Sequence, residues 1–150
     1  SFANCTTIKS LVFPNNLRTI GSSAFAACTN VESVVLGTSV SKINSFAFAY
    51  CHKLLTIRLT DSLTSVGDYA FRECIGLTKY TIASELDDSI FGTGVFYNCS
   101  NLTEKVTFPS KFTSIPNEFL SHCVGLTEFE IHNKIEKSQQ YHIKLKTSII

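Results

Sequence analysis

The residues of this sequence with the clearest chemical potential are six cysteines, which recur at nearly regular intervals. They stand at positions 5, 28, 51, 74, 99 and 123, so the spacings are 23, 23, 23, 25 and 24 residues. A zinc site usually takes its ligands from close pairs such as C-x-x-C, which this spacing does not offer. A catalytic cysteine needs an exposed thiolate beside a base. His52 and His122 each adjoin a cysteine, but adjacent side chains in a turn point in different directions, so we expect no Cys–His nucleophile.

The redox state of the cysteines has two interpretations. Each cysteine lies three residues after an apolar position and three before an aliphatic one, which indicates burial. Stacked repeats would bring neighbouring cysteines within the Cα–Cα range of a disulfide, although side chains in register rarely reach the required dihedral angle. We expect a ladder of buried free thiols that includes Cys28, Cys51 and Cys74, and disulfides between coils are the alternative. The cysteine count therefore leaves the compartment open.

Other catalytic or ligand-binding chemistry has little support in the sequence. Asp87 and Asp88 could bind a cation, but a solvated loop inserted into the repeat is the simpler interpretation. The N-x-[ST] sequons at Asn4, Asn98 and Asn101 are about as many as chance gives for this composition. No glycine-rich phosphate loop, Ser-His-Asp set or H-E-x-x-H motif occurs. The sequence therefore predicts a protein that is not an enzyme and has no metal or cofactor.

The cysteines belong to a longer repeat that must position them. Phenylalanine stands three residues before five of the six cysteines, although the chain has only 12 phenylalanines in 150 residues. Turn residues (glycine, asparagine or proline) stand seven residues before the last five cysteines. After each cysteine the apolar residues follow L-x-x-L-x-L, with one extra residue in the fifth repeat. Periods of 20–29 residues with such positions are typical of leucine-rich repeats.

This pattern predicts an α/β solenoid. Each coil of about 23 residues should contain a main strand, a short second strand and a helical turn on the opposite side that carries A-F-x-x-C. Because no coil can bury its apolar residues alone, the coils must stack and join their main strands in a parallel β-sheet. We expect a leucine-rich repeat stack over residues 1–132, with about six coils of which the first is partial. Its main strands should centre near residues 11, 34, 57, 80, 106 and 129, and Phe71 should lie between Phe48 and Phe96 in a phenylalanine column.

The repeat closely resembles the BspA-like leucine-rich repeats, whose consensus runs I-P-x-x-V-T-x-I-G-x-x-A-F-x-x-C-x-x-L. The segments FPNNLRTIGSSAFAACTNV and LTDSLTSVGDYAFRECIGL follow it almost position by position. The fourth repeat departs from it at Asp87-Asp88-Ser89, and the sixth lacks both the glycine and the phenylalanine. The resemblance implies a surface-antigen-type protein of the kind found in bacteria and parasitic protists, with a role in adhesion to host cells or matrix.

The two ends of the chain differ from the central repeats. Residues 133–150 contain neither a cysteine nor an A-F turn, and apolar residues at 141, 143 and 145 alternate with basic ones, which predicts an atypical C-terminal strand. This strand is either a cap that shields the core from water or a truncated repeat. Residues 1–5 match only the end of a repeat, so we expect further repeats N-terminal to residue 1.

Composition and exposed positions narrow the predicted function. The formal net charge of +1 gives no electrostatic reason for a nucleic-acid partner, and no apolar stretch reaches the roughly 18–20 residues of a membrane span. We predict a protein-binding module whose partner is a host or matrix protein or a neighbouring subunit of an assembly. A cell-surface or extracellular adhesion module is one class, and a cytoplasmic or cytoskeletal scaffold protein is the alternative.

Two surfaces are candidates for partner binding. The first is the outward face of the main strands, where each coil adds one row to a continuous surface. The second is formed by Phe46 and Tyr69, which occupy the same repeat position in successive coils and have Tyr50 and Tyr97 nearby. An ordinary solvated face and partial burial between turns are the respective alternatives. The candidate residues of the first surface are Thr56, Arg58, Lys79, Thr81, Lys105, Thr107, Glu128 and Glu130.

Overall fold

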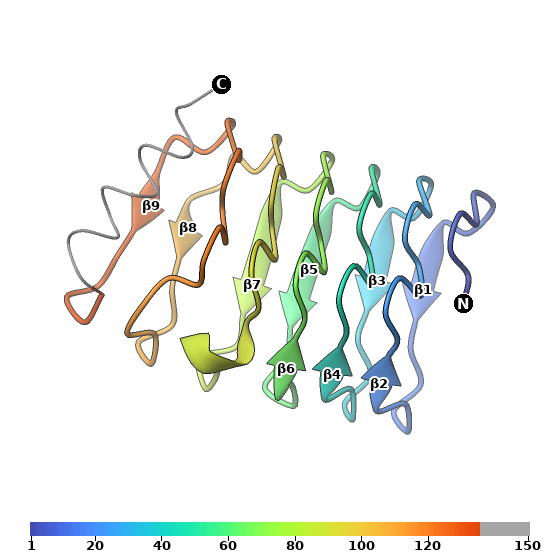
Figure 1. Ribbon diagram of the computed structural model, residues 1–150, viewed down its shortest axis with the longest axis horizontal. Coiled ribbons are helices and arrows are strands. Elements are labelled where there is room, and N and C mark those ends of the chain that lie inside the picture. Colours follow the sequence, from blue (N-terminus) through green and yellow to red (C-terminus); the bar gives the residue numbers. More distant parts are fainter. Residues whose placement is uncertain (136–150) are drawn as a thin grey trace.

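The computed structural model describes residues 1–135, which form a solenoid of stacked coils (Figure 1). Six main strands follow one another along the stack, and every observed pair is parallel. Partners lie 23 residues apart, as in the pairs Ser10–Ser33 and Thr56–Lys79. The six strands predicted from the sequence are confirmed. They are β1 (Ser10–Val12), β3 (Ser33–Val35), β5 (Thr56–Leu59), β7 (Lys79–Ile82), β8 (Val106–Thr107) and β9 (Phe129–Glu130).

A second, shorter sheet lies along the edge of the coils shown at the bottom of Figure 1. Its parallel strands are β2 (Thr19–Ile20), β4 (Lys42–Ile43) and β6 (Ser65–Val66), and a bridge from Val66 to Phe91 continues it into the next coil. In each strand the second residue is buried. Two ladders on different sides of the first four coils therefore hold each of these coils against the next.

The helical turn predicted for the A-F-x-x-C segment is absent from the described residues, whose one helix is the 3-10 helix η1 (Asp88–Ile90). In this segment the backbone N–H groups donate alternately to a carbonyl of the same coil and to a carbonyl of the next coil. The Ala24 N–H donates to the Gly21 carbonyl within the coil at 3.2 Å, whereas the Phe25 N–H donates to the Ala47 carbonyl of the next coil at 2.8 Å. An α-helix cannot share its donors in this way. The described architecture is therefore a parallel-sheet β-solenoid rather than an α/β one.

Left-handed backbone conformations make these turns possible. Two residues in each of the five complete turn segments have a positive φ, for example Ser23 (53°) and Ala27 (57°). Positive φ at the third residue of a four-residue turn is the geometry of a type II turn, and it excludes a continuous helix. Most of these positions carry a side chain rather than glycine, which costs on the order of 1 kcal/mol each.

The core is built around a column of phenylalanine rings. Phe71 stacks on Phe48 with ring centroids 5.3 Å apart and on Phe96 at 5.5 Å, with interplanar angles of 7° and 17°. The column continues through Phe25 to Phe2 at 5.6 Å per step. All three central rings are fully buried, so the column predicted from the sequence is confirmed.

The main sheet is interrupted between β7 and β8, since the four strands β1–β3–β5–β7 form one sheet and β8–β9 another. The extra residue between Leu102 and Val106 has shifted the backbone of the fifth coil out of register with β7. The N–H groups of Thr103 and Glu104 converge instead on the Thr78 carbonyl, at 3.4 and 3.3 Å. The repeat pattern therefore predicted the strands correctly but not this break in their pairing.

The insertion in the fourth repeat joins two coils through hydrogen bonds. Asp87 caps η1 by accepting the Ser89 N–H at 2.9 Å. Asp88 accepts the Thr113 N–H at 2.8 Å and the Ser114 hydroxyl at 2.7 Å. Burial raises the pKa of the Asp88 carboxyl, but these hydrogen bonds outweigh it and hold the pKa below its ordinary value. The insertion thus acts as a connection between coils.

Candidate interaction surfaces

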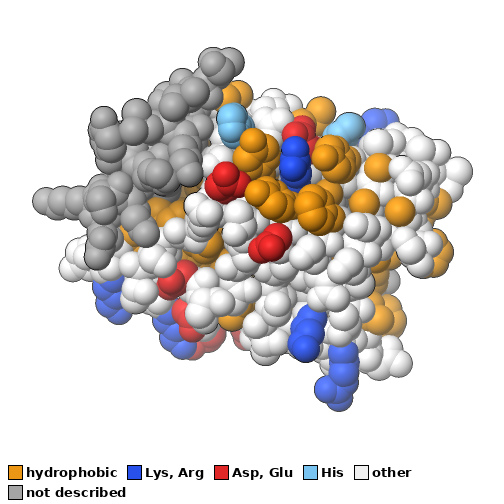
Figure 2. Space-filling model, in the orientation of Figure 1, with side chains coloured by type: hydrophobic (Ala, Val, Ile, Leu, Met, Phe, Trp, Pro, Cys, Tyr) orange, Lys and Arg blue, Asp and Glu red, His pale blue; other side chains and the backbone are white. Residues whose placement is uncertain are grey.

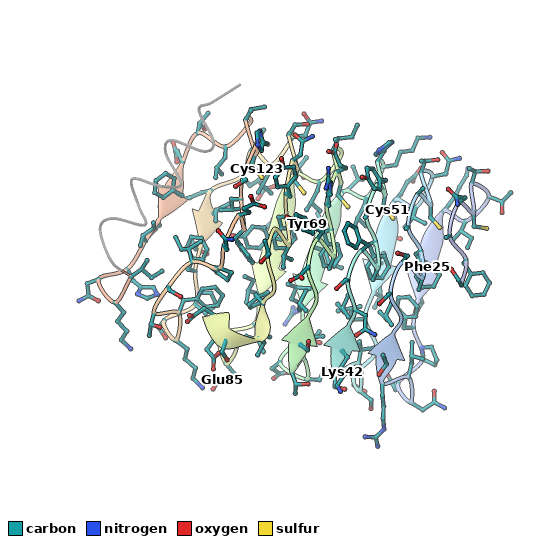
Figure 3. The ribbon with its side chains drawn as sticks, viewed as in Figure 1. Phe25, Lys42, Cys51, Tyr69, Glu85 and Cys123 are labelled. Carbon is teal, nitrogen blue, oxygen red and sulfur yellow. The ribbon has the colours of Figure 1, made fainter. Side chains whose placement is uncertain are left out.

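The cysteines form a buried ladder whose thiols bond to the backbone of the preceding coil. The Cys51 thiol donates to the Phe25 carbonyl at 3.3 Å, and the Cys74 thiol to the Phe48 carbonyl at 3.2 Å. The five cysteines from position 28 onward are fully buried, and all six are free thiols. Burial raises the pKa of Cys51 to about 12, so almost no thiolate forms near neutral pH. The burial predicted for Cys28, Cys51 and Cys74 is confirmed, and Figure 3 shows Cys51 and Cys123 near the same edge of the coils.

Neither a metal site nor a membrane-spanning helix is found among residues 1–135. No group of three or more His, Cys, Asp or Glu side chains among them is placed to hold a metal ion. No helix in that part of the chain has the length and apolar character needed to cross a bilayer. The C-terminal strand predicted near residues 141–145 lies outside the described residues.

The outward face of the main sheet carries the first candidate surface, which we name the sheet strip. All eight of its predicted residues are exposed, as the alternation of the strands requires. The strip consists of Thr56 and Arg58 on β5, Lys79 and Thr81 on β7, Lys105 and Thr107 at β8, and Glu128 and Glu130 at β9.

Two ion pairs between adjacent coils involve lysines of the sheet strip. Lys79 pairs with Glu104 at 3.4 Å, and Lys105 pairs with Glu130 at 2.7 Å. The Lys105 ammonium donates to the Glu130 carboxylate, which lowers the pKa of Glu130 and raises that of Lys105. Both groups are well exposed, so a partner's charges can compete with these pairs at little cost.

Two further features mark the outward face of the main sheet. A hollow of about 440 Å³ opens where β7 and β8 part, with Thr81, Lys105 and Thr107 among its lining residues. At the N-terminal end of the same face, Val12 and Val35 are neighbours in the β1–β3 pairing and are 73% and 54% exposed. The face thus runs from aliphatic through basic to acidic along the stack.

The second candidate surface lies on the turn side of the coils, away from the main sheet. Phe46 and Tyr69 are both half-buried. Their rings stack at 5.4 Å, and Tyr69 meets Tyr97 edge-on at 5.9 Å. The Arg72 guanidinium lies 6.0, 5.5 and 5.0 Å from the ring centres of Tyr50, Tyr69 and Tyr97. We name these five residues the Arg72 cluster. Figure 2 shows it as orange side chains gathered around a blue one.

Glu118 ties the cluster to a more distant coil. The Tyr69 hydroxyl donates to the Glu118 carboxylate at 2.8 Å, across 49 residues of sequence, and this bond raises the pKa of Tyr69. The Tyr69 ring reaches that far because Gly94 occupies the equivalent position of the intervening coil. A Cβ on Gly94 would lie 2.3 Å from Cε1 of Tyr69. Tyr69 stands near the centre of the turn side in Figure 3.

Sequence analysis missed Arg72, Gly94 and Glu118 as parts of this surface. The available signal was the glycine at the position where the two preceding coils carry Phe46 and Tyr69, because a missing side chain leaves room for a ring from the neighbouring coil. Arg72 stands two residues before a cysteine, where the three preceding repeats carry alanine, and this departure from the repeat was the signal available for it.

Comparison with known proteins identifies the family to which this repeat belongs. The model for the BspA-type leucine-rich repeat region matches residues 1–104 and 87–149 in six copies. The chain belongs to this family. Leucine-rich repeats of this type are generally non-enzymatic modules, and solenoids of this kind offer extended binding surfaces. No curated protein sequence matches the chain.

Solved structures with the same fold include a bacterial cell-surface protein. A leucine-rich cell-surface protein of Faecalibacterium prausnitzii is 29% identical, with a TM-score of 0.73 over 86% of this chain and 34% of its own. The leucine-rich repeat protein of T. pallidum is 21% identical, with a TM-score of 0.81 over 96% and 72%. The pneumococcal vaccine antigen PcpA is 18% identical, with a TM-score of 0.56 over 86% and 40%. The last two likenesses concern the fold alone, and this chain spans about a third of the length of the Faecalibacterium protein.

Proposed function

We propose that this chain is a non-enzymatic adhesion module of a cell-surface protein, and that it binds a protein partner through the sheet strip. The observation that carries the proposal is the exposure of all eight residues of the strip on one face, from β5 to β9. A partner can contact several rows of such a face at once, because each coil adds one row to it. The likeness to a bacterial cell-surface protein supports the compartment.

The chemistry of the strip favours a partner with acidic side chains toward the β5–β7 end. Arg58 and Lys79 are exposed there beside the threonine hydroxyls of Thr56 and Thr81, which can donate or accept hydrogen bonds. The carboxylates of Glu128 and Glu130 lie at the other end of the strip. Because the charge changes sign along the strip, a partner of complementary charge binds in one orientation along the stack.

The test is binding of the purified chain to cultured epithelial cells and to cell-free extracellular matrix. The variant Arg58→Glu/Lys105→Glu reverses two charges on the strip, and Lys42→Glu/Lys53→Glu makes the same net change at exposed positions outside it. We expect the strip variant to bind roughly tenfold less protein and the control to bind as the parent does. Equal binding by the three proteins, or equal loss in both variants, would refute the proposal.

A further inference from the structure

The Arg72 cluster is a preorganised surface rather than a group of loose side chains. Arg72 is held mainly by ring faces, since its Nε is buried without a hydrogen-bond partner and its nearest carboxylate oxygen, on Glu73, is 3.9 Å away. Glu73 is fixed in turn by the Asn98 side-chain amide, which donates to it at 2.8 Å. Each part of the cluster is therefore already ordered before a partner arrives, which lowers the entropic cost of binding.

The aromatic residues of the cluster lie at the left-handed positions of the turns. Phe46, Tyr50 and Tyr69 have φ values of 59°, 64° and 55°. The same positions in other coils are also left-handed, as at Ser23 and Glu118. This backbone conformation therefore belongs to the repeat, and only the rings are particular to the cluster.

The charges around the cluster select the partner. Two carboxylates, those of Glu73 and Glu118, accompany the single guanidinium of Arg72. One negative charge is thus left without a positive counterpart within the cluster. Glu73 accepts from Asn98 through one oxygen and lies 3.9 Å from the Arg72 Nε through the other. Glu118 accepts from Tyr69 through one oxygen, and its second oxygen can accept from a ligand. An anionic ligand is disfavoured at this position because it would meet these carboxylates.

The ring geometry distinguishes a protein ligand from a carbohydrate. Stacking of a sugar needs a broad, open ring face, whereas Phe46 and Tyr69 cover each other and the Arg72 guanidinium lies over the three tyrosine rings. Exposed edges of tyrosine combined with arginine are instead the composition that dominates protein–protein contacts. Tyr50 is the most open of the rings and is 37% exposed.

We propose that the Arg72 cluster is a second binding site, on the turn side, for a basic segment of a protein partner. Lysine or arginine side chains of the segment bind the carboxylates of Glu73 and Glu118, while its apolar residues lie against Tyr50 and Tyr97. This site is separate from the sheet strip and does not depend on the function proposed for it, because the strip's basic middle would repel the same segment.

The test measures fluorescence anisotropy of two labelled dodecapeptides, one of alternating arginine and proline and one of alternating glutamate and proline, with the whole chain. We expect the basic peptide to bind and the acidic peptide not to bind. Glu73→Gln/Glu118→Gln should weaken binding roughly tenfold, and Tyr97→Ala should have a similar effect. Glu32→Gln/Asp61→Asn removes the same charge at exposed positions outside the cluster and should leave the affinity unchanged.

Circular dichroism of each variant establishes that the solenoid is intact. The proposal is overturned if the acidic peptide binds more tightly, if neither peptide binds, or if the control pair weakens binding as much as the cluster pair does. Binding on a glycan array that Tyr97→Ala abolishes, with no binding of the basic peptide, would show a carbohydrate site instead. Loss of peptide binding in Glu128→Gln/Glu130→Gln, which removes the carboxylates of the sheet strip, would place the peptide on the strip and likewise contradict the proposal.

Discussion

Replacing Phe71 with alanine should test the phenylalanine column more sharply than any other single change. Phe71 is fully buried and stacked on both sides, on Phe48 and on Phe96. A buried Phe→Ala substitution costs about 3–5 kcal/mol through lost transfer energy and the cavity left behind. For a chain of this length that loss lowers the melting temperature by roughly 6–20 °C.

The chain contains a matched control for this experiment. Phe2 occupies the same repeat position and stacks on Phe25 at 5.6 Å, but it is 59% exposed and has a ring on one side only. Because less than half of its surface is covered, Phe2→Ala should cost about 1–2 kcal/mol. The two variants therefore differ in burial while the chemical change is identical.

Thermal unfolding followed by circular dichroism measures both losses, and amide hydrogen exchange locates them. In a one-dimensional stack, Phe71→Ala should also weaken the coupling between the coils on either side, so amides in the coils of Phe48 and Phe96 should exchange faster. The reasoning fails if Phe71→Ala melts within a couple of degrees of the parent. It fails equally if Phe2→Ala is as destabilising as Phe71→Ala.

Two further predictions concern titratable groups. Alkylation of the native protein near neutral pH should modify the partly exposed Cys5 quickly and leave Cys51 unmodified, because burial raises the pKa of Cys51 to about 12. Mass spectrometry measures the modification. Cys51 modified at the rate of Cys5, or paired in a disulfide, would contradict this prediction. Asp88→Asn should lower the stability at pH 7 by about 0.5–1 kcal/mol. Because the folded-state pKa of Asp88 is depressed, its contribution is present above the unfolded value near 3.8 and is lost as the pH falls through the folded-state pKa. Urea titrations at pH 7 and at about pH 3 should therefore show the difference between Asp88→Asn and the parent shrinking, and a difference that stays constant would exclude this role.

The sequence by itself determined the repeat and everything that follows from its period. The L-x-x-L-x-L pattern fixed where the main strands lie and which side chains face outward, so Arg58 and Lys79 were placed correctly on the exposed sheet face. The column through Phe71 followed for the same reason. Features that repeat in the sequence repeat in space, because each coil in a solenoid contacts only its neighbours.

The tertiary structure alone decided the features that depend on hydrogen bonds between coils or on departures from the period. Donors shared between adjacent coils replaced the predicted helical turn with left-handed turns, as at Ser23 and Ala27. One extra residue before Val106 broke the main sheet at β7. Tyr69 reached Glu118 only because Gly94 left space between them. A periodic pattern predicts what every coil shares, whereas these contacts depend on which unlike side chains meet across the stack, and that is set by the three-dimensional packing.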